Sequence, residues 1–180
     1  MSGPSGVGKG TVLRRLRQKV AGLWVSTSVT TRQPRLGEVD RQRYRFVDDA
    51  TFDELIARGE LLEWSEFDQH RYGTPKAPVL DRLVGGRVAI LELDPKGALR
   101  LRKAFPNARL IFVAPPNWEE LVRRLTDRDT EPDDVIQRRL ALAREELSLE
   151  PMFDRVVVND SVNHVVRELL PEVTTTNSIR

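Results

Sequence analysis

The chain has 180 residues, of which 39% are hydrophobic and 31% are charged, a composition typical of one folded domain with a sizeable core. A net charge of only +2 and the absence of cysteine argue against general nucleic-acid binding, disulfide bonding, thiol catalysis and cysteine-ligated zinc. No apolar run approaches the roughly 18 residues of a membrane span and no signal peptide is visible, so we expect a cytoplasmic protein without a membrane partner.

A glycine-rich segment near the start of the chain is close to the phosphate-loop pattern G-x-x-x-x-G-K-[ST]. It consists of Gly3, Pro4, Ser5, Gly6, Val7, Gly8, Lys9, Gly10 and Thr11. Backbone N–H groups of such a loop point at phosphate oxygens, and the helix that follows adds its positive dipole end and a mobile lysine ammonium. Because Gly10 stands where a hydroxyl residue is usual, we expect phosphates and water to hold Mg²⁺. The segment therefore predicts a nucleotide phosphate site.

Only Met1 and Ser2 precede this loop, although a buried strand normally leads into it. Two residues are too few for a strand, so either the natural chain starts further upstream or the central strand is missing. We favour the upstream start, and we expect a chain without that strand to be poorly stable because two neighbouring strand edges would be exposed.

Apolar periodicity and turn residues predict alternating strands and helices. The expected strands are residues 24–29, 44–47, 61–64, 88–94, 109–113 and 155–159. The expected helices start near residue 9 and after residue 75 and cover 52–57, 118–128, 133–149 and 161–170, before a polar tail at 171–180. This order predicts an α/β fold, a doubly wound parallel sheet with helices on both faces. We assign residues 1–29, 75–124 and 139–180 to the core, 30–74 to an inserted lobe and 125–138 to a helical lid.

The segment from Ser28 to Glu38 combines hydroxyl, guanidinium and carboxylate groups in a loop punctuated by proline and glycine. Arg32 and Arg35 stand three positions apart across a proline, and two guanidinium groups so spaced can converge on one phosphate. Tyr44, in the next expected strand, adds a phenol donor. A solvated basic loop is the alternative, but the clustering of these groups favours a second phosphate site.

Two carboxylates, Glu92 and Asp94, end the apolar run at residues 88–94. Ligands of open α/β sheets bind at such carboxyl ends of strands. Asp94 can contact a base or the metal, or it can cap a helix that starts at Pro95, and the sequence leaves both interpretations open.

Arginines are also concentrated on two expected helices that flank a polar turn at residues 127–132. These arginines are Arg123, Arg124 and Arg128 on the first helix and Arg138, Arg139 and Arg144 on the second. The arrangement is typical of a lid that closes over transferring phosphates, and a salt-bridged helical hairpin is the alternative. Neither histidine has neighbours arranged as metal ligands, so we assign no protein ligand to a metal.

Taken together, these motifs resemble bacterial guanylate kinases over essentially the whole chain, apart from the first strand. The matching segments are residues 3–11, 30–38, 62–64, 72–74, 91–94, 114–116, 138–140 and 157–160. The phosphate loop is shared by many kinases, whereas residues 30–38 followed by Glu63 and Tyr72 are much more specific. The lid turn departs from the family, because Asp127 and Asp129 stand where glycines are usual and can weaken the attraction of Arg128 for phosphate.

The resemblance implies a P-loop kinase fold with a GMP-binding lobe, and it implies a role for each matching residue. The residues implied to bind GMP are Ser28, Arg32, Arg35, Glu38, Tyr44 and Tyr72 around the phosphate, Glu63, Thr74 and Asp94 facing guanine, and Glu92. The residues implied to stabilise the transferring phosphoryl group are Lys9, Arg124, Arg128 and Arg139. ATP would bind the phosphate loop, with Asn159 near its adenine and Mg²⁺ bridging its phosphates.

The resemblance further implies an enzyme of purine nucleotide metabolism that phosphorylates GMP, and also dGMP, with ATP. Two alternatives stay open: a catalytically weak guanylate-kinase-like module that binds phosphopeptides, and a kinase of another nucleoside monophosphate. We expect ATP and GMP as partners, and a monomer or homodimer.

Overall fold

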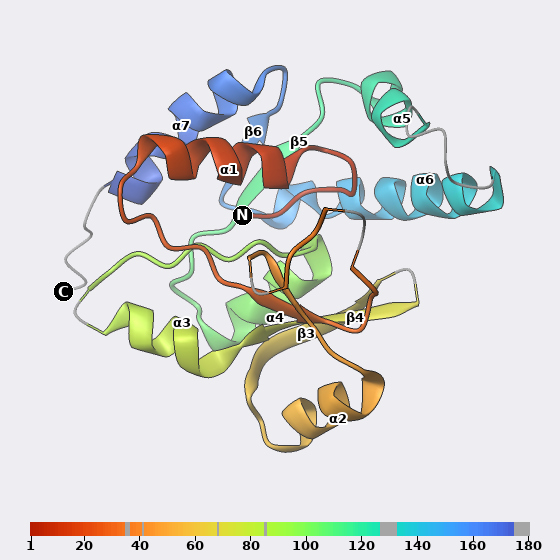
Figure 1. Ribbon diagram of the computed structural model, residues 1–180. Coiled ribbons are helices and arrows are strands. Elements are labelled where there is room, and N and C mark those ends of the chain that lie inside the picture. Colours follow the sequence, from red (N-terminus) through yellow and green to blue (C-terminus); the bar gives the residue numbers. More distant parts are fainter. Residues whose placement is uncertain (35–36, 41, 68, 85, 127–132, 175–180) are drawn as a thin grey trace. The chain divides into compact units, whose positions relative to one another are not determined.

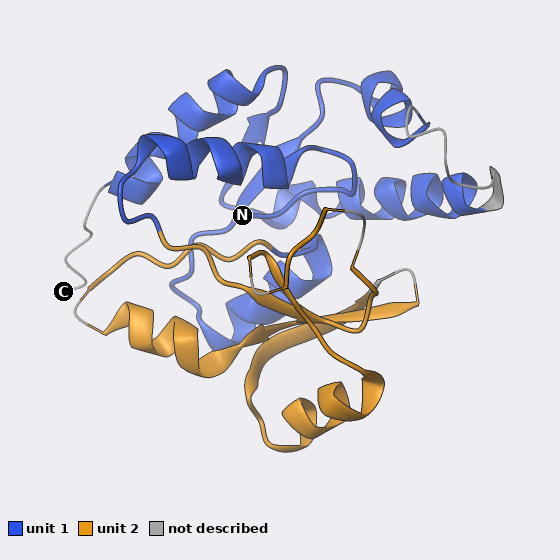
Figure 2. Ribbon diagram, in the orientation of Figure 1, with its two compact units in different colours: residues 1–23, 93–175 blue, residues 24–92, 176–180 orange. Residues whose placement is uncertain are grey.

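The structure is a computed structural model that describes residues 1–34, 37–40, 42–67, 69–84, 86–126 and 133–174 (Figure 1). It contains two compact units, residues 1–23 with 93–175 and residues 24–92 (Figure 2). The second unit is wider than the lobe predicted at 30–74, because it also includes helix α3 (Lys76–Leu83) and the segment around Ile90. The functional boundaries of the lobe therefore stay a prediction.

The first unit is built on two parallel strands, β5 (Ile111–Ala114) and β6 (Arg155–Val158), which are paired from Ile111↔Arg155 to Ala114↔Val158. Its helical elements are α1 (Lys9–Lys19), α4 (Pro95–Ala104), α5 (Trp118–Thr126), α6 (Asp133–Ser148), the 3-10 helix η1 (Glu150–Met152) and α7 (Val162–Thr174). The apolar residues of α1 recur at helical spacing, so one face is buried, and α1 packs against α7.

Ser2 pairs with β5 just before the phosphate loop begins, and Met1 is hydrogen-bonded to Leu93. The Ser2 N–H donates to the carbonyl of Ile111 at 2.8 Å, and the N–H of Val113 donates to the Ser2 carbonyl at 2.8 Å. On the other side, the N–H of Leu93 donates to the Met1 carbonyl at 3.2 Å. The loop thus begins directly after Ser2, which is hydrogen-bonded to β5 through its backbone and to the Leu93 carbonyl through its hydroxyl. A phosphate loop normally follows a strand in this way.

The second unit contains a four-stranded sheet with the order β2-β1-β4-β3. Its elements are β1 (Ser28–Thr30), β2 (Tyr44–Phe46), α2 (Asp49–Ala57), β3 (Leu61–Phe67), β4 (His70–Pro75) and α3. The pairing of β1 with β2 is parallel, whereas β4 runs antiparallel to both of its neighbours. Helix α2 starts three residues before the expected residue 52 and ends at Ala57 as expected. The Asp48 carboxylate caps it by accepting a hydrogen bond from the N–H of Thr51 at 2.8 Å.

Several expected elements differ in the structure. The strand expected at residues 24–29 is reduced to an isolated bridge at Val25 and the short strand β1. Residues 88–94 do not form a continuous strand: Ile90 makes a single parallel bridge to Val25, and Leu93 bonds to Met1, so the backbone is extended without a ladder. The tail expected from residue 171 is partly helical, because α7 continues through Pro171 to Thr174. A proline near the end of a helix removes only one donor, and the buried face of the helix compensates for it. The α/β class itself is confirmed.

Candidate active site

The phosphate loop closes tightly over the start of α1. Gly8 caps this helix with a φ of 97°, and its carbonyl accepts the N–H of Thr11 at 3.0 Å. A Cβ atom on Gly8 would lie 2.9 Å from Nδ2 of Asn159, and one on Gly3 would lie 2.2 Å from the Val113 carbonyl oxygen. Glycine is therefore required at both positions, by backbone conformation and by close approach.

Lys9 is the first residue of α1, and its side chain folds back over the loop. The ammonium donates to the carbonyl of Pro4 at 3.0 Å and also to that of Gly3. The positive charge is thereby kept beside the backbone N–H groups at the amino end of the helix, where an anion is favoured.

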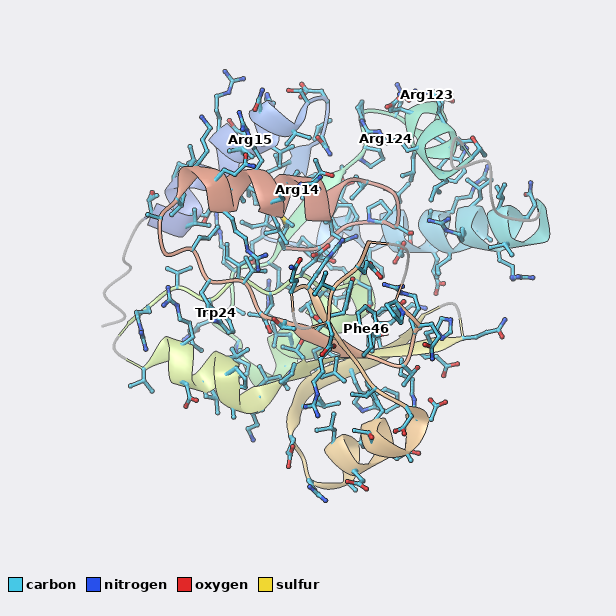
Figure 3. All side chains as sticks on the ribbon, viewed as in Figure 1. Arg14, Arg15, Trp24, Phe46, Arg123 and Arg124 are labelled. Carbon is cyan, nitrogen blue, oxygen red and sulfur yellow. The ribbon has the colours of Figure 1, made fainter. Side chains whose placement is uncertain are left out.

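Arg124 and Asn159 reach the loop from two other elements of the same unit. The Arg124 guanidinium, which extends from α5 (Figure 3), donates to Glu120 at 2.8 Å, to the Asn159 carbonyl at 3.2 Å and to the Val7 carbonyl at 3.4 Å. The buried amide of Asn159 donates to the same Val7 carbonyl at 2.7 Å. Asn159 thus holds the loop backbone at Val7 by a hydrogen bond, and its contact with adenine stays a prediction.

Helix α6 contributes two buried charged residues to the loop. Nη2 of Arg139 donates to Oγ of Ser5 at 3.4 Å, and the Ser5 N–H donates to Oε2 of Glu146 at 3.0 Å. Burial raises the pKa of the Glu146 carboxyl, while Lys9 and the Ser5 N–H act in the opposite direction. Glu146 was not predicted from the sequence, although its spacing of seven from Arg139 places both residues on one helix face.

The second unit contains a cluster of aromatic and charged side chains around Arg32. This buried guanidinium makes a two-pronged ion pair with Glu38, at 2.8 and 3.0 Å, and donates to the Gln33 carbonyl at 2.7 Å. It also lies 5.5 Å from the ring centroid of Tyr44 and 5.6 Å from that of Phe46. Fork-like guanidinium groups in such surroundings are suited to phosphate recognition.

Strand pairing brings the predicted hydroxyl residues to the same cluster. Ser28 is the register partner of Tyr44, and Tyr72 is that of Thr30. The two tyrosine rings meet edge to face at 6.0 Å. Burial, with a smaller effect from Glu92, raises the pKa of Tyr44 to about 12, so the phenol stays a hydrogen-bond donor at neutral pH.

Glu63 and Thr74 form a buried polar pair across the β3–β4 hairpin. They are register partners, and Oγ1 of Thr74 donates to Oε1 of Glu63 at 2.7 Å. Glu63 is only 7% exposed and Thr74 only 1%. The hydroxyl fixes one carboxylate oxygen, which orients the side chain as a planar acceptor.

Glu92 and Asp94 lie in different units, and the structure shows a partner for each. Glu92 accepts from Nε of Arg43 at 3.1 Å and from a second nitrogen of the same guanidinium, and Arg43 is a contact that the sequence analysis missed. Asp94 caps α4 by accepting from the N–H of Gly97 at 2.8 Å, with Pro95 at the first helical position. The capping interpretation is therefore confirmed, while a contact with guanine stays a prediction.

Two predicted site residues, Arg35 and Arg128, lie outside the described residues, as does the turn at 127–132. Within the described ranges, no group of three or more acidic or histidine side chains could hold a metal ion. Nor does any helix in those ranges have the length and apolar character needed to cross a membrane.

A glycine-rich loop that opens a helix beside a parallel β-ladder, with a lysine and two arginines directed at it, defines a P-loop protein of the kinase type. The guanylate kinase family profile matches residues 1–174. The guanylate kinase of Streptomyces coelicolor is 56% identical over 94% of this chain and 86% of that protein, and that of Thermobifida fusca is 58% identical over 94% and 87%.

Among solved structures, the crystal structure of guanylate kinase from Anaplasma phagocytophilum is similar with a TM-score of 0.76 and 29% identity. The similarity covers 97% of this chain and 85% of that one. The chain belongs to the guanylate kinase family, as its motifs predicted.

Proposed function

We propose that this protein transfers the γ-phosphoryl group of ATP to GMP, and to dGMP, producing ADP and the nucleoside diphosphate. The observation that carries the proposal is the buried Glu63–Thr74 pair, in the same unit as the Arg32 cluster. The names of the relatives, all guanylate kinases, support the same activity.

Glu63 would select guanine by its hydrogen-bonding pattern. The Watson–Crick edge of guanine presents two adjacent donors, N1–H and the N2 amino group, and a carboxylate accepts such a pair. Adenine presents no such pair, and a buried acceptor left unpaired costs about 1–3 kcal/mol. Arg32, Tyr44 and Tyr72 would meanwhile bind the GMP phosphate through charge-assisted and phenol hydrogen bonds.

The first unit would bind and activate ATP. Backbone N–H groups of the loop and Lys9 would hold its phosphates, and Arg124 and Arg139 would neutralise charge that develops on the transferring phosphoryl group. No protein nucleophile is required, because an oxygen of the GMP phosphate attacks the γ-phosphorus directly.

Mg²⁺ would accompany ATP, and the residues at positions 10 and 11 fit an ion that the protein itself binds only weakly. Position 10 is glycine, and the hydroxyl of Thr11 accepts a hydrogen bond from Arg14 at 3.4 Å. Phosphate oxygens and water would therefore supply the ligands, as suits an ion that keeps much of its hydration shell. When bound, the ion would offset negative charge on the phosphates of ATP.

The intact loop glycines and Lys9 give no support to the alternative of a catalytically weak binding module. A cytoplasmic location and a monomeric or homodimeric state stay predictions.

A coupled assay of ADP release with ATP and Mg²⁺ tests the proposal. GMP, AMP, CMP and UMP are supplied in parallel, and release should depend on GMP. Equal release with AMP would contradict the role of Glu63, and no release with GMP at saturating ATP would contradict the activity.

A further inference from the structure

Helix α6 touches the phosphate loop along one face. Arg139, Ala143 and Glu146 are all buried, and their spacing of four and three residues places them on one side of the helix. Ala143 packs with Leu121 and Leu125 of α5. The apolar middle of this face therefore anchors α6, and the charged residues on either side of it both contact Ser5.

Ser5 is held through two different groups. Its hydroxyl accepts from Arg139 at 3.4 Å, whereas its backbone N–H donates to Glu146 at 3.0 Å. Glu146 is 3% exposed. The carboxylate is therefore withdrawn from water, and its contact with the backbone of the loop is direct.

We propose that Glu146 is a positioning residue, which holds the amino-terminal half of the phosphate loop in its ATP-binding conformation by accepting the hydrogen bond of the Ser5 N–H. The inference rests on the ATP site of the proposed function. Glu146 touches the loop and not the reacting atoms, so its effect on ATP passes through the backbone at Ser5.

A backbone N–H left without an acceptor at this partly buried position would favour other loop conformations. The useful property of Glu146 is thus its acceptor oxygen and not its charge. Lys9 and Lys96 lie near enough to attract this carboxylate, and Asp94 is near enough to repel it. A negative charge here also opposes the phosphates of ATP, so a neutral acceptor should serve the loop at least as well.

Three variants separate the acceptor from the charge and from the packing. Glu146→Gln keeps an acceptor oxygen without the charge, and Glu146→Met keeps the side-chain length without an acceptor. Glu145→Ala is the matched control, since Glu145 is the exposed neighbour on the same helix and pairs with Lys96 at 2.7 Å. Thermal unfolding checks that each variant folds.

The readout is the affinity for ATP with Mg²⁺, measured by titration calorimetry without GMP, beside the affinity for GMP alone. We expect Glu146→Met to weaken ATP binding roughly three- to tenfold, the range of one lost hydrogen bond. Glu146→Gln and Glu145→Ala should stay within about twofold of wild type or bind more tightly, and GMP affinity should be unchanged throughout.

Wild-type ATP affinity in Glu146→Met, or an equal loss in Glu146→Gln, would overturn the proposal. If Glu146→Met does not fold, exchange of the Ser5 amide with solvent deuterium is compared in wild type and Glu146→Gln. Similar protection of this amide in both proteins supports the proposal, and its loss in Glu146→Gln overturns it. A wild-type protein that binds ATP but does not phosphorylate GMP would contradict the proposed function and leave this inference standing.

Discussion

The two units build their candidate phosphate sites from different groups. In the first, the loop between Ser2 and α1 presents backbone N–H groups, and side chains such as Asn159 and Glu146 mainly hold that backbone in place. In the second, Arg32, Tyr44 and Glu63 are presented by strands and a loop. A backbone site binds phosphate on any nucleotide, whereas a side-chain site can also select the base. We therefore propose that the first unit contributes affinity for phosphate and the second contributes selectivity for the base.

The largest expected effect is the loss of Lys9, the charged side chain that belongs to the phosphate loop itself. Lys9→Met should lower kcat by roughly 10²–10³-fold, the usual cost of removing one preorganised charge-stabilising donor. Lys19→Met, at the exposed last turn of α1, is the control. Steady-state kinetics with GMP measures both variants, and a kcat within twofold of wild type in Lys9→Met would assign the charge stabilisation elsewhere.

The next effect concerns the backbone itself. Gly3→Ala should lower the free energy of unfolding by roughly 3 kcal/mol, because its Cβ would lie 2.2 Å from the Val113 carbonyl oxygen at a φ of 140°. Gly22→Ala should cost only about 1 kcal/mol, since φ is 72° there but no heavy atom beyond the adjacent residues lies within 4 Å of the new Cβ. Urea unfolding of both variants compares them, and equal losses would show that conformation alone, without close approach, requires the glycines.

For the side-chain site, Glu63→Gln should lower kcat/KM for GMP by about 10- to 100-fold, corresponding to one mismatched buried acceptor. The KM for ATP should stay within about twofold of wild type if the first unit binds ATP and the second binds GMP, as we propose. Glu66→Gln, on the exposed side of the same strand, is the control. An equal loss of kcat/KM for ATP and for GMP would mean that the substitution damages the whole protein, and it would contradict a specific contact between Glu63 and guanine.

Local sequence chemistry predicted much of this arrangement. The spacing of glycines and lysine predicted the phosphate loop, and the apolar run around Glu63 predicted a strand there. Strand β4 and its hairpin with β3, in which Glu63 and Thr74 are register partners, were not predicted. Contacts distant in sequence could not be predicted in this way. Glu146 lies 141 residues from Ser5, and Arg43 lies 49 residues from Glu92, so only the tertiary fold brings each pair together.

Asp94 illustrates a different limit. A carboxylate before proline at the end of an apolar run fits both a ligand contact and a helix cap, and the same atoms can serve either. The sequence could not distinguish them because both need the same residue at the same position. The hydrogen bond from Gly97 identifies the cap.

The smallest expected effect is a titration, and it tests how well the side-chain site excludes water. The chain has two tyrosines, so Tyr72→Phe leaves Tyr44 as its single phenol. Absorbance near the phenolate band should give a midpoint well above 10 in the folded variant, because burial and Glu92 still disfavour the phenolate when the smaller effect of Tyr72 is removed. The pKa of an exposed tyrosine is about 10, so the folded state holds this proton more tightly than the unfolded state does. The Tyr44 contribution to stability should therefore be complete below pH 10 and be lost as the pH rises toward 12. A midpoint near 10 in the folded protein would mean that water reaches the phenol, and that the second unit recognises phosphate through an open surface and not a dry cluster.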